Sequence, residues 1–366
     1  MTFYTSKLTL FSLFRCVPPE AMDALLGGGQ GNPEAWPEGV YSGCEATDGP
    51  IEEIRSRAGK WLALEIIGGI NFMSPVVAID EHDIWVYAMD GAYIEPQKVQ
   101  AIAVTNGDRY SVLVHTEQPG HFKIRGHSSS PPQIITGHAN LFVKGPGSGC
   151  HKESKPWIGL VGEALGEDVV FFNQDTAAPY PPEPIPQSAD ALHVLNMLPD
   201  GASYLWALNS TRLMPDDLEK RTPPFLFAPT PNIQNNVTIT TKNNTWVDLV
   251  LYASVFPMPS HPIHKHGNKM YQIGKGTGEW IWDSVDEAIK EIPESFNLKN
   301  PPRRDAFMSP LTEASVAWVV VRYHVSNPGP WLLHCHVNNH QLGGMVVVIQ
   351  DGVGAWPEVP EKYVNF

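Results

Sequence analysis

Two histidine clusters near the carboxyl terminus hold the residues best suited to chemistry in this sequence. The first reads HPIHKHG and begins at His261, and the second reads HCHVNNHQLGGM. Within the second cluster, Cys335, His340 and Met345 follow a C-x4-H-x4-M spacing. A thiolate, an imidazole and a thioether suit a soft or borderline metal, and a further imidazole from His261 completes the ligand set of a blue copper site. We therefore predict a mononuclear copper ion that accepts electrons from a reducing substrate.

The other four histidines of these clusters are spaced to face away from the cysteine. Successive side chains of a strand point to opposite faces, so the two histidines of each H-x-H motif point the same way. In the HCH motif the cysteine points the other way. Four imidazoles can therefore face a second metal site, linked to the first through the few bonds around the cysteine. These residues are His264, His266, His334 and His336.

Zinc is the main alternative metal, because zinc sites also use cysteine and histidine. A zinc site would not explain the C-x4-H-x4-M spacing or the imidazoles on the opposite face of the strand. The softness and the number of the ligands therefore favour copper. Met345 has an alternative role as a core residue after the turn Gly343-Gly344. Its spacing favours the axial ligand.

Short strands must position these residues, because alternating apolar runs dominate the chain. The clearest runs are residues 76–80, 84–89, 99–104, 110–115, 236–241, 245–255 and 315–323. The 34 prolines and 31 glycines agree with many strands joined by turns. Helical segments are few: residues 283–292, with Ser284 as a candidate cap, form the clearest, and residues 216–220 form a short turn. The pattern predicts an all-β fold of Greek-key sandwiches with few short helices.

The length of 366 residues predicts two domains rather than one sandwich. The natural boundary is the stretch GPGSGCHKESK, which is rich in glycine, serine and charge. We expect a first domain over residues 1–146, a linker over residues 147–157 and a second domain over residues 158–366.

Charge and hydropathy exclude two classes of function. The formal net charge is −14, and no basic stripe is present, which excludes a nucleic-acid role. An acidic surface suits neutral or cationic small molecules. No apolar run approaches the roughly 18 residues that a membrane span needs.

The remaining cysteines leave their pairing open. Cys16 and Cys44 lie in one expected domain and either pair or stay as buried thiols. Cys150 either is free or pairs with chain that is absent here.

The sequence also contains features that bear on secretion of the protein. Three N-glycosylation sequons, at Asn209, Asn236 and Asn243, favour a secreted glycoprotein. Residues 8–14 form an apolar run, but Arg15 follows where a small cleavage residue is expected, so we predict a β-strand there and no signal peptide.

At these residues the chain resembles the multicopper oxidases, which include laccases, fungal ferroxidases and ascorbate oxidase. The carboxy-terminal signatures of that family appear as HPIHKHG and NPGPWLLHCHVNNHQLGGM. The first domain is similar to the middle cupredoxin domain of the family in AIDEHDIWVYAMDGAYIEP and TNGDRYSVLV. HPIHKHGN followed by GTGEWIWDSVDEA most resembles ascomycete members linked to conidial pigment. The resemblance implies two cupredoxin-like domains.

The resemblance also implies a role for each histidine of the clusters. Type 1 copper is expected at His261, Cys335 and His340 with Met345 axial. Type 2 copper is expected at His264, and the type 3 pair at His266, His334 and His336. A phenol, naphthol, aromatic amine or ferrous ion would then give single electrons to type 1 copper near an exposed edge of His261 or His340. Dioxygen would be reduced to water at the trinuclear cluster.

The sequence departs from the family in one respect. The trinuclear cluster of the family uses eight histidines, four of them from two H-x-H motifs of an amino-terminal domain. The other histidines of this sequence form no H-x-H pair: His82, His115, His121, His127, His138, His151, His193 and His324. We expect the amino-terminal cupredoxin domain to be missing and the trinuclear site to be half encoded. A blue copper electron carrier without oxygen reduction and a relic that folds without metal stay as alternatives.

Two further groups have both a functional and a structural interpretation. The acidic and aromatic residues after the first cluster either border the type 1 site or form a solvated loop and helix start. They are Glu279, Trp280, Trp282, Asp283, Asp286 and Glu287. His82 is expected to be a buried structural histidine.

Overall fold

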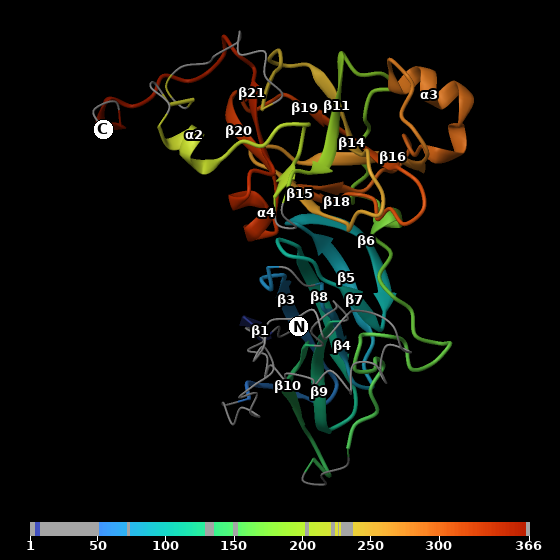
Figure 1. Cartoon of the computed structure of the whole chain (residues 1–366). Helices are drawn as coiled ribbons and strands as arrows, with labels where there is room; N and C mark the ends of the chain where they lie inside the picture. Colours follow the sequence, from blue (N-terminus) through green and yellow to red (C-terminus); the bar gives the residue numbers. More distant parts are fainter. Residues whose placement is uncertain are drawn as a thin grey trace, which may run out of the picture. The chain divides into compact units, whose positions relative to one another are not determined.

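A computed structural model describes most of the chain as two compact units (Figure 1). The units comprise residues 1–173 and 174–366. The described residues are 4–7, 51–71, 74–128, 135–148, 153–201, 205–220, 224–225, 227 and 237–363. The predicted strand at residues 8–14, the cysteines Cys16, Cys44 and Cys150, and the sequon at Asn236 lie outside them.

The first unit contains two five-stranded sheets. One sheet has the order β1 (Tyr4–Lys7), β3 (Lys60–Ile67), β8 (Arg109–Thr116), β5 (Ile84–Met89) and β6 (Ala92–Val99). The other has the order β2 (Glu53–Arg57), β10 (Ile135–Lys144), β9 (Gly120–Ser128), β4 (Val76–Ile79) and β7 (Ala101–Ala103). Neighbours in each sheet are often distant in sequence, as in the Greek-key sandwiches expected from the alternating apolar runs.

The compact units divide after the linker predicted at residues 147–157. Residues beyond that linker still pack on the first unit. Ser154 Oγ donates a hydrogen bond to Asp80 at 2.6 Å, and the N–H of Phe172 donates to the carbonyl of Ala101 at 2.8 Å. These long-range contacts hold the stretch before Gln174 to the first unit, which local composition does not reveal.

The second unit contains a six-stranded and a five-stranded sheet. The six-stranded sheet has the order β12 (Trp206–Ala207), β11 (Ala191–Pro199), β14 (Trp246–Ala253), β19 (Ala317–His324), β16 (Met270–Thr277) and β17 (Arg303–Arg304). The five-stranded sheet has the order β13 (Thr238–Thr240), β21 (Val346–Asp351), β20 (Gly329–Cys335), β15 (Pro262–Lys265) and β18 (Ala306–Met308). The all-β prediction is confirmed.

Strand β19 shows how the core of the second unit is built. Its residues are almost all buried, because both faces of its sheet are covered. Val319 and Val321 belong to the apolar core that also contains Cys335 and Met345. Trp318, one position along the strand, belongs to a separate cluster on the other face. Burying each valine stabilises the folded unit by roughly 1.5–3 kcal/mol. Strand β19 therefore contributes to the apolar clusters on both faces of its sheet.

Helices are few and short among the described residues. They are α2 (Pro215–Glu219), α3 (Val285–Glu291), α4 (Asn338–Leu342), η2 (Gln174–Thr176), η3 (Pro293–Ser295) and η4 (Glu361–Tyr363). The predicted helix and cap are confirmed, because Ser284 Oγ accepts a hydrogen bond from the N–H of Glu287 at 3.2 Å. In the part of the chain that the structure describes, no helix has the length and apolarity to cross a bilayer.

Candidate metal centre

Three elements of the second unit bring His261, Cys335 and His340 together. His261 directly precedes β15, and Cys335 ends β20, the strand that pairs with β15. His340 lies in α4, a short helix of five residues. The helix folds the chain back on itself, since the N–H of His340 donates to the carbonyl of Val337 at 3.0 Å. Without that turn, His340 would lie too far along the chain to face Cys335.

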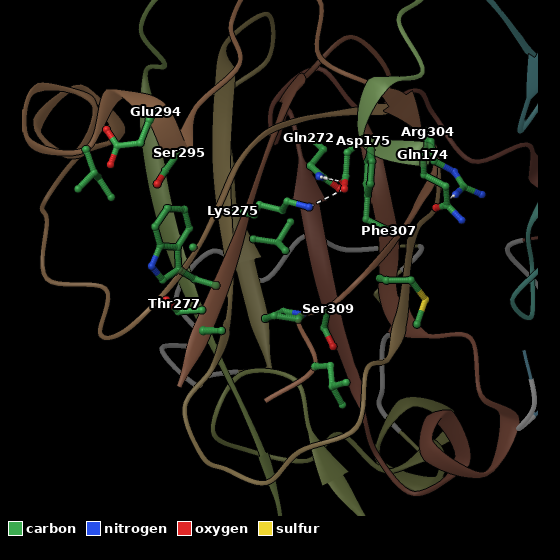
Figure 2. A pocket seen from close by; sticks show the side chains of 18 residues that line it. Gln174, Asp175, Gln272, Lys275, Thr277, Glu294, Ser295, Arg304, Phe307 and Ser309 are labelled. Carbon is green, nitrogen blue, oxygen red and sulfur yellow. Dashed lines mark hydrogen bonds and ion pairs between the residues drawn. The ribbon is translucent and has the colours of Figure 1, made fainter. Parts of the chain in front are cut away.

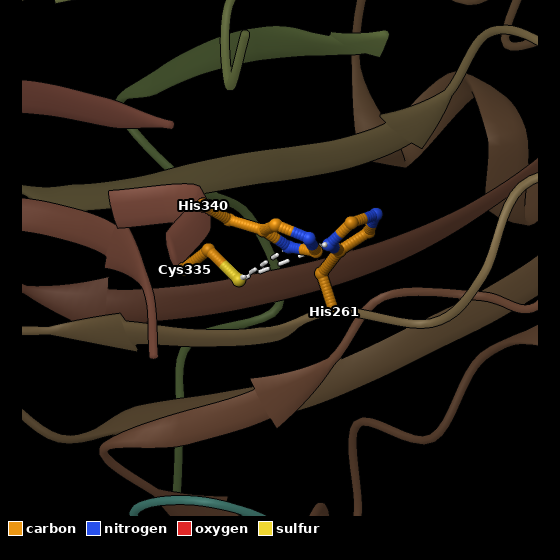
Figure 3. Close-up of side chains that lie close together, drawn as sticks. All are labelled: His261, Cys335 and His340. Carbon is orange, nitrogen blue, oxygen red and sulfur yellow. Dashed lines mark hydrogen bonds between the residues drawn. The ribbon is translucent and has the colours of Figure 1, made fainter. Parts of the chain in front are cut away.

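The donor atoms of these three side chains form a small triangle (Figure 3). The Nδ1 atoms of His261 and His340 lie 3.1 Å apart, and each lies 3.7 Å from Cys335 Sγ. A point equidistant from all three lies about 2 Å from each, close to the roughly 2.0–2.1 Å of metal–nitrogen bonds and the roughly 2.3 Å of metal–sulfur bonds. The two imidazoles and the thiol therefore fit a trigonal metal ion of the kind bound in blue copper sites.

Met345 lies close to this triangle in the fold. Its side chain is fully buried and belongs to the same core cluster as Cys335. Its backbone is tied to both neighbours in the cluster: its carbonyl accepts from the N–H of Cys335 at 3.1 Å, and its N–H donates to the carbonyl of His340 at 2.9 Å. The backbone of Met345 is thus held next to Cys335 and His340, and the axial role of its thioether stays a prediction.

Burial determines the protonation states of His261, Cys335 and His340. Desolvation lowers the pKa of His261 to about 3 and that of His340 to about 4. Burial likewise raises the pKa of Cys335 to about 12. Both imidazoles are therefore neutral and keep a free lone pair, whereas the sulfur becomes a thiolate only with a cation beside it.

The sequence led us to expect a solvent-exposed ring edge at His261 or His340, but both side chains are buried. The side chain of His261 is completely buried, and that of His340 is nearly so. The ring of Trp206 packs against that of His261, with 4.5 Å between centroids. Among the described residues, none accepts or donates a hydrogen bond at His261 Nε2. The expectation of a solvent-exposed imidazole edge is therefore wrong for His261, because Trp206 and the core cover it.

The other four histidines gather on the opposite side of strands β15 and β20. His264 and His334 are paired across the two strands, so their side chains share one face, whereas Ile263 pairs with Cys335 on the other. The Nε2 atoms of His266 and His334 lie 3.0 Å apart, and donor atoms of His264, His266 and His334 all lie within 4.8 Å of one another. The ring centroid of His336 lies 5.6 Å from those of His264 and His334.

Backbone carbonyls orient two of these rings. His264 Nδ1–H donates to the carbonyl of Asp305 at 2.8 Å, and His334 Nδ1–H donates to that of Cys335 at 2.8 Å. Each ring then keeps the lone pair on Nε2 for binding a metal, because a metal-binding histidine commonly donates its other ring N–H to a carbonyl. Burial lowers the pKa of His334 to about 4, which keeps its ring neutral.

The acidic and aromatic loop after the first cluster lies away from the triangle of His261, Cys335 and His340. Trp280 and Trp282 pack with Trp318 in the cluster on the outer face of the six-stranded sheet, and Cys335 lies in the cluster on its inner face. Asp286 and Glu287 form the first turn of α3, where carboxylates are favourable. Of the two interpretations of this loop, the structure supports the helix start.

The second unit contains a cavity that the sequence did not indicate (Figure 2). Its volume is about 740 Å³, within the range of small-molecule sites. Ser309 lines it, and Ser309 Oγ accepts a hydrogen bond from the N–H of His261 at 2.8 Å. Phe307 and Val319, also in its wall, belong to the core cluster of Cys335.

The polar rim of this cavity is formed by residues of η2, β16 and β17 (Figure 2). Asp175 accepts hydrogen bonds from Lys275 at 2.5 Å and from Gln272 at 2.9 Å. Arg304 donates to Gln174 at 2.5 Å. An aromatic molecule with a hydroxyl group would find both apolar wall and hydrogen-bonding partners here.

His82 has the structural role that the sequence suggested. It is buried, and its Nδ1–H donates to the carbonyl of Asp80 at 2.7 Å. Its ring packs edge-on against Phe122.

Comparison with known proteins agrees with the site. Family models described as multicopper oxidase match residues 12–144 and residues 211–354. This chain belongs to the multicopper oxidase family. Laccase ustL of Ustilaginoidea virens is 38% identical, over 91% of this chain and 54% of its own length. Laccase abr2 of Aspergillus fumigatus is 35% identical, over 98% of this chain and 61% of its own length.

Solved structures of multicopper oxidases share the fold. The laccase from Botrytis aclada matches with a TM-score of 0.64 and 22% identity, over 90% of this chain and 57% of its own. Fet3p, a multicopper oxidase that functions in iron import, matches with a TM-score of 0.63 and 20% identity, over 85% of this chain and 60% of its own. The chain spans little more than half the length of these relatives.

Proposed function

We propose that this chain is the electron-accepting part of a laccase-like multicopper oxidase. In this proposal His261, Cys335 and His340 bind type 1 copper, with Met345 as the axial ligand. Phenols, naphthols or ferrous ions are the donors, and dioxygen is the final acceptor of the whole protein. The observation that carries the proposal is the buried triangle of two Nδ1 atoms and one sulfur, with sides of 3.1 and 3.7 Å.

The residues of the triangle would divide the work between them. Copper bound there supplies one-electron chemistry between its two common oxidation states. Cys335 supplies the thiolate, and the neutral imidazoles supply lone pairs without adding charge. The N–H of Val337 donates to Cys335 Sγ at 3.4 Å, which orients the sulfur. Because Cys335 is bonded to His334 and His336, a single peptide bond separates it from each of these two members of the second cluster.

The second cluster would supply half of a trinuclear site. We assign His264 to type 2 copper and His266, His334 and His336 to the type 3 pair. The proximity of three donor atoms within 4.8 Å supports this assignment. The second candidate function is a blue copper electron carrier, in which these four histidines take no part in oxygen reduction.

We further infer that an aromatic donor docks in the cavity beside Ser309. The hydrogen bond from His261 to Ser309 supports this position, because it joins the cavity wall to a copper ligand. Asp175 can accept the hydroxyl hydrogen of a phenol, and Phe307 offers an apolar surface to its ring.

Colour and oxygen uptake test the proposal. The chain produced with copper should be intensely blue, and Cys335→Ser should be colourless. Cys150→Ser is the matched control and should stay blue. A blue Cys335→Ser protein would overturn the ligand assignment. Oxygen consumption with 1-naphthol by a whole oxidase that includes this chain and the other half of the trinuclear site separates the two candidates, since a carrier would turn blue and consume none.

A secretory route with N-glycosylation is also proposed. Asn243 is exposed in the described structure, as a glycan acceptor must be. A fall in mass after enzymatic removal of N-glycans would support it, and an unchanged mass would contradict it.

A further inference from the structure

Lys265, between the histidines of the HKH motif, is buried completely. Its side chain is 0% exposed, as is that of Asp351. Strand alternation points it away from His264 and His266, into the face that Ile263 and Cys335 share. An isolated ammonium group in such a place is strongly unfavourable, so its partners must account for its presence.

Four groups surround the ammonium of Lys265. Nζ donates to Asp351 Oδ2 at 2.7 Å, to Asn268 Oδ1 at 2.9 Å and to the carbonyl of His266 at 3.1 Å. It also lies 4.5 Å from the ring centroid of Tyr323, over the face of the ring. The three hydrogen bonds satisfy all the donors that an ammonium has.

Asp351 connects this ammonium to two further side chains of the unit. Its Oδ1 accepts from the hydroxyls of Tyr323 and Thr241, each at 2.8 Å. Lys265 is on β15, Asp351 ends β21, Tyr323 is on β19, and Thr241 follows β13. One carboxylate therefore links two strands of the five-stranded sheet with a strand of the six-stranded sheet.

Stability alone does not explain an ion pair at this position. Replacing a buried pair by well-packed apolar residues is often neutral or stabilising, so Leu or Met would serve a strand core as well. What an apolar residue cannot do is hold the backbone of the turn that follows. Lys265 binds the carbonyl of His266 and the side chain of Asn268, and thereby fixes the peptide that orients the His266 ring.

The backbone of Lys265 holds the other histidine as well. Its N–H donates to the carbonyl of Asp305 at 3.0 Å, and the same carbonyl accepts from His264 Nδ1–H at 2.8 Å. A shift of Lys265 would therefore move both rings of the motif.

We propose that Lys265 and Asp351 are positioning residues, which lock the HKH motif so that His264 and His266 present their ring nitrogens to the second cluster. The metal role of that cluster rests on the proposed function. The positioning itself is a property of the chain and is measurable without metal.

The first experiment observes the ring of His264 by NMR in the metal-free full chain. A hydrogen-bonded imidazole Nδ1–H gives a slowly exchanging downfield signal, which His264→Ala would identify. In Lys265→Met we expect this signal to broaden or vanish. The matched control is Arg322→Met, which breaks another fully buried ion pair, with Asp248, in the same unit. The control should keep the signal.

The second experiment measures binding of Cu²⁺ alone by calorimetry in the Cys335→Ser background, where the type 1 thiolate is absent. Lys265→Met should weaken binding to the histidine cluster by about 10- to 100-fold, the usual effect of losing a group that orients a metal ligand. Arg322→Met should leave the affinity unchanged.

Two results would overturn the positioning role. One is a His264 signal that persists in Lys265→Met while the melting temperature falls as it does in Arg322→Met. The other is equal loss of the signal in both variants. If Lys265→Met does not fold, Tyr323→Phe can replace it, because this variant removes only one of the two hydroxyl groups that donate to Asp351. The His264 signal should then weaken, and an unchanged signal would count against the proposal. A Cys335→Ser chain that binds no Cu²⁺ but shows the NMR effect would contradict the proposed metal role of the second cluster and leave the positioning role supported.

Discussion

Substitution of Met345 gives the sharpest test of the axial ligand. Met345→Leu nearly conserves volume in a fully buried site, so the structural cost should stay below about 1.5 kcal/mol. Met345→Ala instead leaves a cavity and should cost about 2–5 kcal/mol. For a unit of this size, each kcal/mol lowers the melting temperature by roughly 2–4 °C. The metal-free Leu variant should therefore melt within about 6 °C of the parent, and the Ala variant up to about 20 °C lower.

The copper-loaded Leu variant separates ligation from packing. If the thioether is an axial ligand, losing it should raise the reduction potential, because leucine cannot coordinate. The blue colour should remain, since both imidazoles and the thiolate stay in place. A redox titration followed at the blue absorption band measures the potential, with the melting temperature as the control for folding. An unchanged potential in a folded, blue Met345→Leu protein would show that the buried sulfur is only a core residue.

Three further outcomes follow from the structure. Leu311→Trp, in the lining of the cavity beside Ser309, should slow the reduction of the blue copper by 1-naphthol several-fold, with little change in the blue spectrum of the oxidised protein. An unchanged rate would argue against docking there. Arg322→Met should destabilise the second unit by about 3–5 kcal/mol in denaturant unfolding, because it leaves Asp248 buried without its bidentate partner; a loss under 1 kcal/mol would contradict this. The first unit should lose stability below pH 6.5, because burial lowers the pKa of His82 and His127 in the folded state, so the unfolded chain binds protons first. The free energy of unfolding falls by at most about 1.4 kcal/mol per pH unit for each histidine. The double variant His82→Gln, His127→Gln should show a smaller fall. Denaturant unfolding at pH 7 and pH 5.5 measures the difference.

The local order of residues determined which side chains are suited to bind metal and which way they face. Cys335, His340 and Met345 are close in sequence, so their convergence needs only a strand end and one turn. The separation of Cys335 from His334 and His336 follows from strand alternation, which depends on backbone geometry alone. The all-β class follows likewise from the alternating apolar runs, and the helix after Ser284 from a local cap.

Packing of distant strands decided the rest. His261 faces Cys335 across 74 residues of sequence, and Lys265 meets Asp351 across 86, at distances that only the pairing of β15 with its neighbours sets. The same packing buries the ring of His261, which was expected to have an exposed edge. It also places Trp280 and Trp282 on the outer face of the six-stranded sheet and forms the cavity that Ser309 lines. Periodicity specifies that a side chain is buried, but which side chain it meets depends on how two sheets stack, and a one-residue change of register would reverse every face.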